Sequence, residues 1–176
     1  MSRLYTVLLF SMSCFVCIGQ TKTNTKKEKI NVSLIGTAYL FENKTYGGAT
    51  FSMLTTHKSP AQIGIVGGLA KISDDGFSYP VGFNFRLSSS KSNISPVIDV
   101  QGGVLIYNQK LAPSTYIKGL SFFNAGAGIV FGNTKKASFM ILGKYQVFTT
   151  TLYLNNRSSG NSKAEVFQVS LGINFH

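Results

Sequence analysis

FQVSLGINFH, residues 167–176, gives the strongest indication of the fold class in this chain. Apolar side chains alternate along it with polar or small ones, without interruption. Because successive side chains of a β-strand point to opposite faces, this pattern predicts a strand with one apolar and one polar face. The predicted apolar face consists of Phe167, Val169, Leu171, Ile173 and Phe175.

Similar alternating segments follow one another from residue 30 onward. β-Branched and aromatic residues dominate them, and none contains the run of about 18 apolar residues that a membrane helix needs. We expect eight strands, at 30–41, 47–56, 62–72, 79–87, 97–107, 120–131, 137–150 and 166–175. The connections between them alternate in character: polar turns at 57–61, 88–95 and 133–136 lie between others that include the two longest, 108–116 and 154–165. This alternation places the long connections at one end of an up-and-down antiparallel sheet.

The first residues have the pattern of an export signal. Arg3 precedes an apolar stretch, residues 4–18, that is too short and too interrupted to span a membrane as a helix. We expect cleavage near Gly19, which gives a signal peptide at 1–19, a polar leader at 20–29 and one barrel domain at 30–176. Both cysteines, Cys14 and Cys17, lie in the signal, so the mature chain has no thiol; acylation of Cys17 is an alternative.

The composition favours a membrane barrel over a soluble domain. Charged residues make up 13% of the chain, whereas a soluble domain has about 25%. The formal net charge is +11, but the lysines concentrate near the start and in predicted turns, with no basic helix or basic-aromatic motif. This excludes nucleic acid as the expected partner and leaves an attraction to anionic lipid headgroups.

The polar faces of the predicted strands carry the charges that a membrane barrel must keep away from lipid. Reflecting strand 79–87 onto strand 97–107 through the turn between them brings Arg86 close to Asp99 and Asn84 close to Gln101. We expect a polar network in the lumen, made of Arg86, Asp99, Asn84, Gln101, Lys144, Gln146 and Gln168. Such a network fills a narrow barrel, or it lines a narrow gated pore. On this pattern, arginine should be tolerated better at Ser170 than at Leu171.

The sequence offers no catalytic or metal-binding constellation. The histidines are His57, in a predicted turn, and His176, and neither stands with a nucleophile and a carboxylate. Asp74-Asp75-Gly76 is ordinary turn chemistry or a weak calcium ligand set. Gly126-Ala127-Gly128 lacks the third glycine and the following helix of a nucleotide-binding loop. We therefore expect no enzymatic activity, no cofactor and no metal.

From residue 30 to residue 176 the chain resembles the small eight-stranded outer-membrane β-barrels of the OmpA/OmpX-like type. The resemblance rests on the strand pattern, the alternating connections and the closing strand, although His176 departs from the final aromatic residue usual there. It implies an outer-membrane location, contact with outer-membrane lipid, insertion by the barrel-assembly machinery and a monomeric state. Within this type, functions range from structural anchors and adhesins to narrow pores.

Three functions therefore remain open at this stage. The first is a non-enzymatic structural or surface-interaction protein, whose long connections would make the contacts. The second is a narrow pore for ions or small solutes. The third is a soluble lipocalin-like barrel that carries an apolar ligand, which would require a polar exterior.

Overall fold

The computed structural model describes residues 29–41, 44–56, 60–74, 76–88, 93–132 and 137–175. The expected signal peptide, nearly all of the leader, the turn at 133–136 and both histidines lie outside the described residues. The described strands are β1 (Lys29–Leu40), β2 (Thr45–Thr56), β3 (Ala61–Ser73), β4 (Gly76–Ser88), β5 (Ile94–Ile106), β6 (Asn108–Ala112), β7 (Thr115–Phe131), β8 (Ala137–Leu154) and β9 (Arg157–Phe175). The described part of the chain contains no helix that could cross a membrane.

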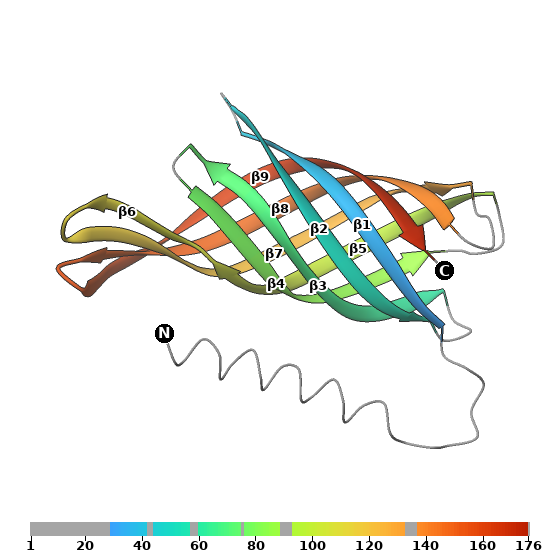
Figure 1. Ribbon diagram of the computed structural model, residues 1–176, viewed down its shortest axis with the longest axis horizontal. Coiled ribbons are helices and arrows are strands. Elements are labelled where there is room, and N and C mark those ends of the chain that lie inside the picture. Colours follow the sequence, from blue (N-terminus) through green and yellow to red (C-terminus); the bar gives the residue numbers. More distant parts are fainter. Residues whose placement is uncertain are drawn as a thin grey trace, which may run out of the picture.

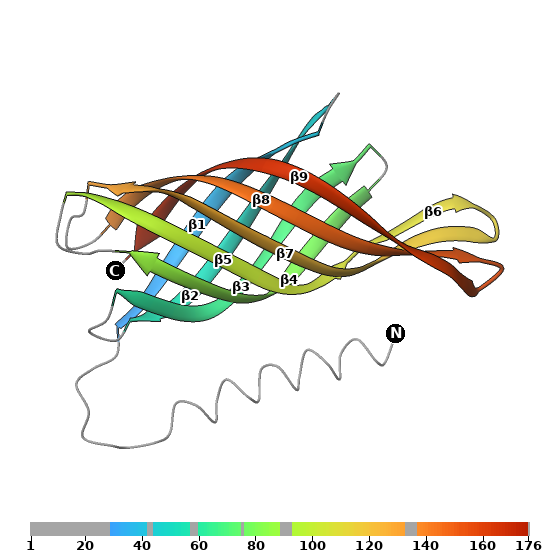
Figure 2. The same cartoon turned by 180° about the vertical axis from the view of Figure 1, so that it is seen from behind.

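These strands form one antiparallel sheet that closes on itself (Figures 1 and 2). Strands adjacent in sequence pair with each other, except that β5 pairs with β7 instead of β6; β1 pairs with β9. Since β6 pairs only with β7, the remaining eight strands make up the barrel wall. The all-β, up-and-down architecture and the eight wall strands predicted from the sequence are confirmed.

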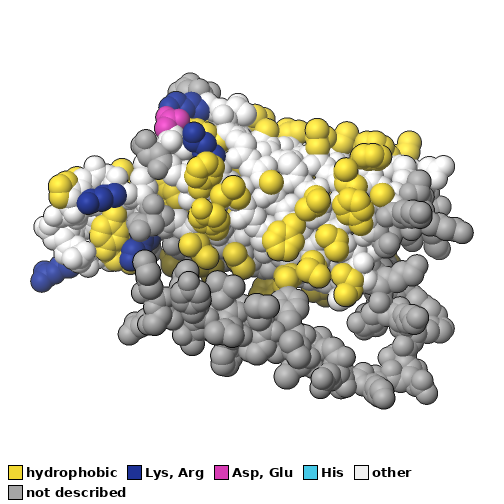
Figure 3. Space-filling model, in the orientation of Figure 1, with side chains coloured by type: hydrophobic (Ala, Val, Ile, Leu, Met, Phe, Trp, Pro, Cys, Tyr) yellow, Lys and Arg dark blue, Asp and Glu magenta, His cyan; other side chains and the backbone are white. Residues whose placement is uncertain are grey.

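The wall is apolar outside and mostly polar inside. All five apolar residues of the closing strand are exposed, with Leu171 at 61%. Other strands follow the same rule, as Phe83 on β4 is 72% exposed while its neighbour Asn84 is 1% exposed. Figure 3 shows apolar side chains spread over the visible wall and Lys or Arg side chains gathered towards one end. This polarity is the reverse of a soluble barrel and suits an exterior in lipid, so it contradicts the lipocalin-like alternative.

Glycines let the narrow wall close. A Cβ added to Gly128 on β7 would lie 1.8 Å from the carbonyl oxygen of Ile141 on β8, and one added to Gly82 on β4 would lie 2.2 Å from that of Gly102 on β5. No side chain fits at either place, because the neighbouring backbone occupies the space. In Gly126-Ala127-Gly128, Gly128 is therefore required for strand packing and is not part of a phosphate-binding loop.

Two segments predicted as loops are instead paired strands. Residues 108–116 contain β6 and the start of β7, and residues 157–165 belong to β9. Their turns are short, at Pro113-Ser114 and Asn155-Asn156, and both asparagines have positive φ, 48° and 63°. The expectation that these two segments are long loops was wrong: Ser, Gly and Asn have low strand propensity, and cross-strand pairing overrides it here.

The paired segments form an external sheet that projects beyond the barrel. We use this name for residues 108–119 and 149–165, from β6, β7, β8 and β9. The hairpins of this sheet protrude at one end, whereas the C-terminal end of β9 lies at the other (Figure 1). The start of β1 lies beside that end, since Val32 pairs with Phe175. The sheet thus stands at the end opposite the connections 57–60, 89–93 and 132–136, where the alternation of connections placed segments 108–116 and 154–165.

The outward face of β9 provides a test of the membrane exterior. Leu171 is the central outward residue of the paired segment 167–175, and arginine at mid-membrane costs about 2–4 kcal/mol. We expect Leu171→Arg to reduce the amount of folded barrel in the outer membrane, read as heat-modifiable gel migration. The matched control is Ser158→Arg, on the same strand in the external sheet, which should assemble normally.

Equal assembly of the two variants would contradict the placement of this face in lipid. Ser170→Arg is no longer a suitable control, contrary to the expectation from the sequence. Ser170 is 1% exposed and its hydroxyl lies 2.9 Å from that of Thr37. An arginine there would overfill the interior.

Candidate functional site

The polar residues predicted for the lumen lie in two adjacent rows that run across the strands. In the first row, Arg86 of β4 faces Asp99 of β5, which faces Gly126 of β7, which faces Lys144 of β8, which faces Gln168 of β9. In the second row, Asn84, Gln101, Asn124 and Gln146 face one another in the same order of strands. All seven predicted residues are therefore inward-facing, and each is at most 3% exposed.

Asp99 is the centre of the first row. Its carboxylate accepts from Arg86 Nε at 2.8 Å and from Lys144 Nζ at 2.7 Å, and Gln101 Nε2 donates to it at 2.9 Å. Asp99 itself is 0% exposed. One buried carboxylate is thus shared by two buried cations, so this cluster has a formal charge of +1.

Gly126 makes the contact of Lys144 with Asp99 possible. It occupies the position between them in the row, and a Cβ there would lie 2.6 Å from Lys144 Cγ. Without a side chain at this position, the lysine can cross β7 and reach the carboxylate on β5. The sequence placed Lys144 in the lumen but did not reveal this shared partner, although an inward glycine between two charged strands was the available signal.

Arg86 connects the row to the closing strands. Its Nη1 donates to Ser33 Oγ at 2.8 Å on β1 and to Asn174 Oδ1 at 3.1 Å on β9. Ser33 in turn donates to Asn174 Oδ1 at 2.6 Å. The guanidinium therefore bridges β4 to the β1–β9 pair at which the barrel closes. Sequence reasoning did not include Ser33 and Asn174, although both lie on the polar faces of their strands.

Several buried polar atoms have no hydrogen-bond partner among the described residues. They are Ser52 Oγ, Asn84 Nδ2 and Oδ1, Arg86 Nη2 and Asn124 Oδ1. A cavity of about 10 Å³ lies beside Lys144, Asn124 and Gln101. That volume holds about one water molecule. Among the residues with unpaired atoms, Asn124 lines this cavity, so a water molecule there would be placed to donate to its Oδ1.

Apolar side chains fill the lumen on either side of the polar rows. Towards the external sheet, Tyr39, Leu105, Tyr107, Phe122 and Phe148 belong to one buried cluster. Towards the other end lies a second cluster, made of Ile35, Val97, Met140 and Leu142. The described side chains thus form a packed interior rather than an open channel.

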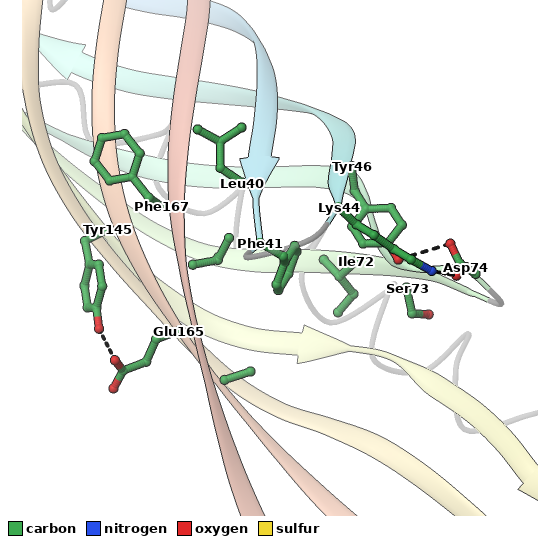
Figure 4. Close-up of a pocket in the computed structure, with 12 residues that line it drawn as sticks. Leu40, Phe41, Lys44, Tyr46, Ile72, Ser73, Asp74, Tyr145, Glu165 and Phe167 are labelled. Atoms are coloured by element: carbon green, nitrogen blue, oxygen red, sulfur yellow. Dashed lines mark hydrogen bonds and ion pairs between the residues drawn. The ribbon is translucent and has the colours of Figure 1, made fainter.

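A groove of about 760 Å³ lies at the mouth of the barrel, at the base of the external sheet (Figure 4). Phe41 and Ile72 lie on one side of it, and Tyr145 and Glu165, which hydrogen-bond to each other, lie on the other. The groove exists because β1 ends at Leu40, whereas β9 continues beyond it.

An ion pair holds the hairpin tips beside this groove. Lys44, between β1 and β2, donates to Asp74, between β3 and β4, and the Tyr46 hydroxyl donates to the same carboxylate at 3.1 Å. The hydrogen bond from Lys44 lowers the pKa of Asp74, and the same contact raises the pKa of Lys44. The Asp74 carboxylate thus already accepts hydrogen bonds from two side chains of this chain. No group of three or more His, Cys, Asp or Glu that could hold a metal occurs among the described residues.

The N-terminal part of β9, residues 157–166, has one open edge. β1 covers this edge of β9 only along residues 167–175, so residues 157–166 have no strand partner on that side among the described residues. Their other side pairs with β8. An open edge presents backbone donors and acceptors to whatever lies beside it.

No protein family model matches the chain, and no curated protein matches its sequence. Solved structures match its fold. Neisserial surface protein A has a TM-score of 0.59 at 9% identity, with 85% of this chain and 99% of that chain covered. The N-terminal β-barrel domain of Pseudomonas aeruginosa OprF has a TM-score of 0.50 at 11% identity, with 85% and 98% covered. Together with the apolar exterior, these likenesses establish the fold of a small outer-membrane barrel, as the resemblance implied.

The two cations on Asp99 provide a test of the lumen network. Asp99→Asn leaves Arg86 and Lys144 uncompensated, and removing one partner of a buried pair costs about 3–5 kcal/mol. Lys144→Met leaves the Arg86–Asp99 pair intact and should cost less. We expect Asp99→Asn to lower the free energy of unfolding in detergent, measured with urea, more than Lys144→Met does.

Adding Lys144→Met to Asp99→Asn should restore part of the loss, because one uncompensated charge disappears. Strictly additive losses in the double variant would show that Lys144 and Asp99 do not interact.

Proposed function

We propose that the chain is a non-enzymatic integral outer-membrane protein that acts through its external sheet, in a surface-interaction role. The observation that carries this proposal is the sheet itself, in which β7, β8 and β9 continue past the wall and β6 is added. These residues contribute nothing to closing the barrel. The length of β8 and β9, 18 and 19 residues, exceeds the 9–11 or so that a membrane strand needs.

The open edge of β9 supports an interaction with an extended segment of another protein. Such a segment could add to residues 157–166 as a further strand, with main-chain hydrogen bonds supplying affinity. The groove with Phe41 and Ile72 beside this edge would receive its side chains.

The packed lumen favours this role over that of a narrow pore. Conduction would require the Asp99 network and the apolar clusters on both sides of it to move apart. We therefore expect purified protein in planar bilayers to show no steady single-channel conductance. Regular, reproducible conductance steps from the wild-type barrel would favour the pore instead.

Shortening the external sheet tests the interaction role directly. Thr151 and Asn161 face each other in register, so residues 152–160 can be replaced by an Asn-Gly turn that closes a two-residue hairpin. We expect this variant to assemble normally, with heat-modifiable migration, while cells that display it attach less to matrix-coated and cell-coated surfaces. Undiminished attachment by the shortened barrel, where the wild type attaches, would contradict the role assigned to the sheet.

A further inference from the structure

The outward face of the external sheet carries a cluster of cations and tyrosines just beyond the apolar wall. We call it the rim face; it consists of Lys110, Tyr116, Lys118, Tyr153 and Lys163. Register places these residues on one side. Lys110 faces Tyr116, which faces Tyr153. Lys118 is two residues from Tyr116 on β7, and Lys163 faces Thr149, which is four residues from Tyr153 on β8.

The two tyrosines hold Lys118 in place. Their rings stack with centroids 5.0 Å apart and an interplanar angle of 7°. Lys118 Nζ lies 5.2 Å from the centroid of each ring. A cation above the faces of two stacked rings is attracted by both, so the ammonium is positioned while remaining exposed.

The rim face begins where the apolar exterior ends. On β7 the outward side chains from Leu120 to Phe131 are free of charge, and a tilted strand of this length spans about 28 Å. Beyond Leu120, in the direction away from the wall, Lys118 is the next outward side chain on β7. On β9, Glu165 and then Lys163 follow after Phe167. A hydrocarbon layer around the apolar wall therefore places the rim face at the level of the lipid headgroups.

The charges on this face favour an anion. Among the described residues, Glu165 contributes the carboxylate on this face, and the Tyr145 hydroxyl donates to that carboxylate. Three lysines oppose it. Outward hydroxyl groups of Thr149, Tyr116 and Tyr153 add hydrogen-bonding capacity beside the ammonium groups. A phosphate with neighbouring sugar or glycerol hydroxyls matches this combination of groups.

We propose that the rim face binds the phosphate-bearing headgroup of a lipid in the leaflet from which the external sheet emerges. The bound headgroup would hold the base of the sheet against the membrane surface. The site requires the placement of the wall in a membrane but not the interaction role, so the two can fail separately.

Native mass spectrometry of the purified barrel in detergent tests this site. The probes are bisphosphorylated lipid A and its monophosphorylated analogue, which share their acyl chains. We expect the wild type to retain the bisphosphorylated lipid more strongly. Lys118→Gln should weaken that binding about fivefold, and Lys163→Gln in addition should weaken it about fivefold again, the effect of one cation near an anionic surface.

Arg157→Gln is the matched control. Arg157 faces Leu154 at the tip of the same sheet, one position beyond the Tyr153–Ser158 pair and so on the opposite face. The control should bind like the wild type, and all variants should show heat-modifiable migration. The proposal would be overturned by equal retention of the two lipids, by an equal loss in Arg157→Gln, or by displacement of the lipid with pyrophosphate at equal concentration. The last result would indicate a site for free phosphate.

Discussion

The pairing of β1 with β9 is the contact on which the rest of this structure depends. Inside a lipid bilayer no water is available to satisfy a strand edge, so a sheet can span the membrane only if it closes. Residues at the start of the described chain therefore pair with residues at its end, from Val32 opposite Phe175 to Leu40 opposite Phe167. The surrounding lipid fixes the polarity of the closed sheet, because the apolar face of every wall strand must then point outward.

The interior follows from this polarity. Charges that cannot face lipid are collected in the lumen, where Asp99 bonds to both Arg86 and Lys144 and where Arg86 reaches the closing pair through Ser33 and Asn174. The same contacts occupy the space through which a solute would pass. A narrow lumen filled by this charge cluster and by the apolar clusters on either side of it has little room for a channel, and this directs attention to the outside of the barrel.

Most of the wall could be predicted from the sequence because its signal is local. Strict alternation in residues 167–175 identifies a strand and its faces, and the short connection between β4 and β5 places Arg86 opposite Asp99. The contact of Lys144 with Asp99 was not predictable in this way. It crosses β7, depends on the glycine at position 126, and exists only because the tilt and curvature of the closed wall bring β5 and β8 together.

The external sheet was missed for a different reason. Residues 157–163 are polar, with Ser and Gly prominent, and their composition indicates a loop. Pairing with the C-terminal part of β8 makes them a strand nevertheless, with one register shift between Leu152 and Tyr153, as far as Leu154 opposite Arg157. The stretch that sequence reasoning assigned to loops is thus ordered by neighbours on another strand, and the groove and the rim face both result from it.

Envelope fractionation followed by gel migration of unheated and heated samples tests whether this chain is a closed barrel with its apolar face in lipid. We expect the protein in the outer-membrane fraction, with a mobility that changes on heating because the closed sheet resists detergent until it is heated. Recovery from the soluble periplasmic fraction without detergent, with the same mobility before and after heating, would contradict that claim.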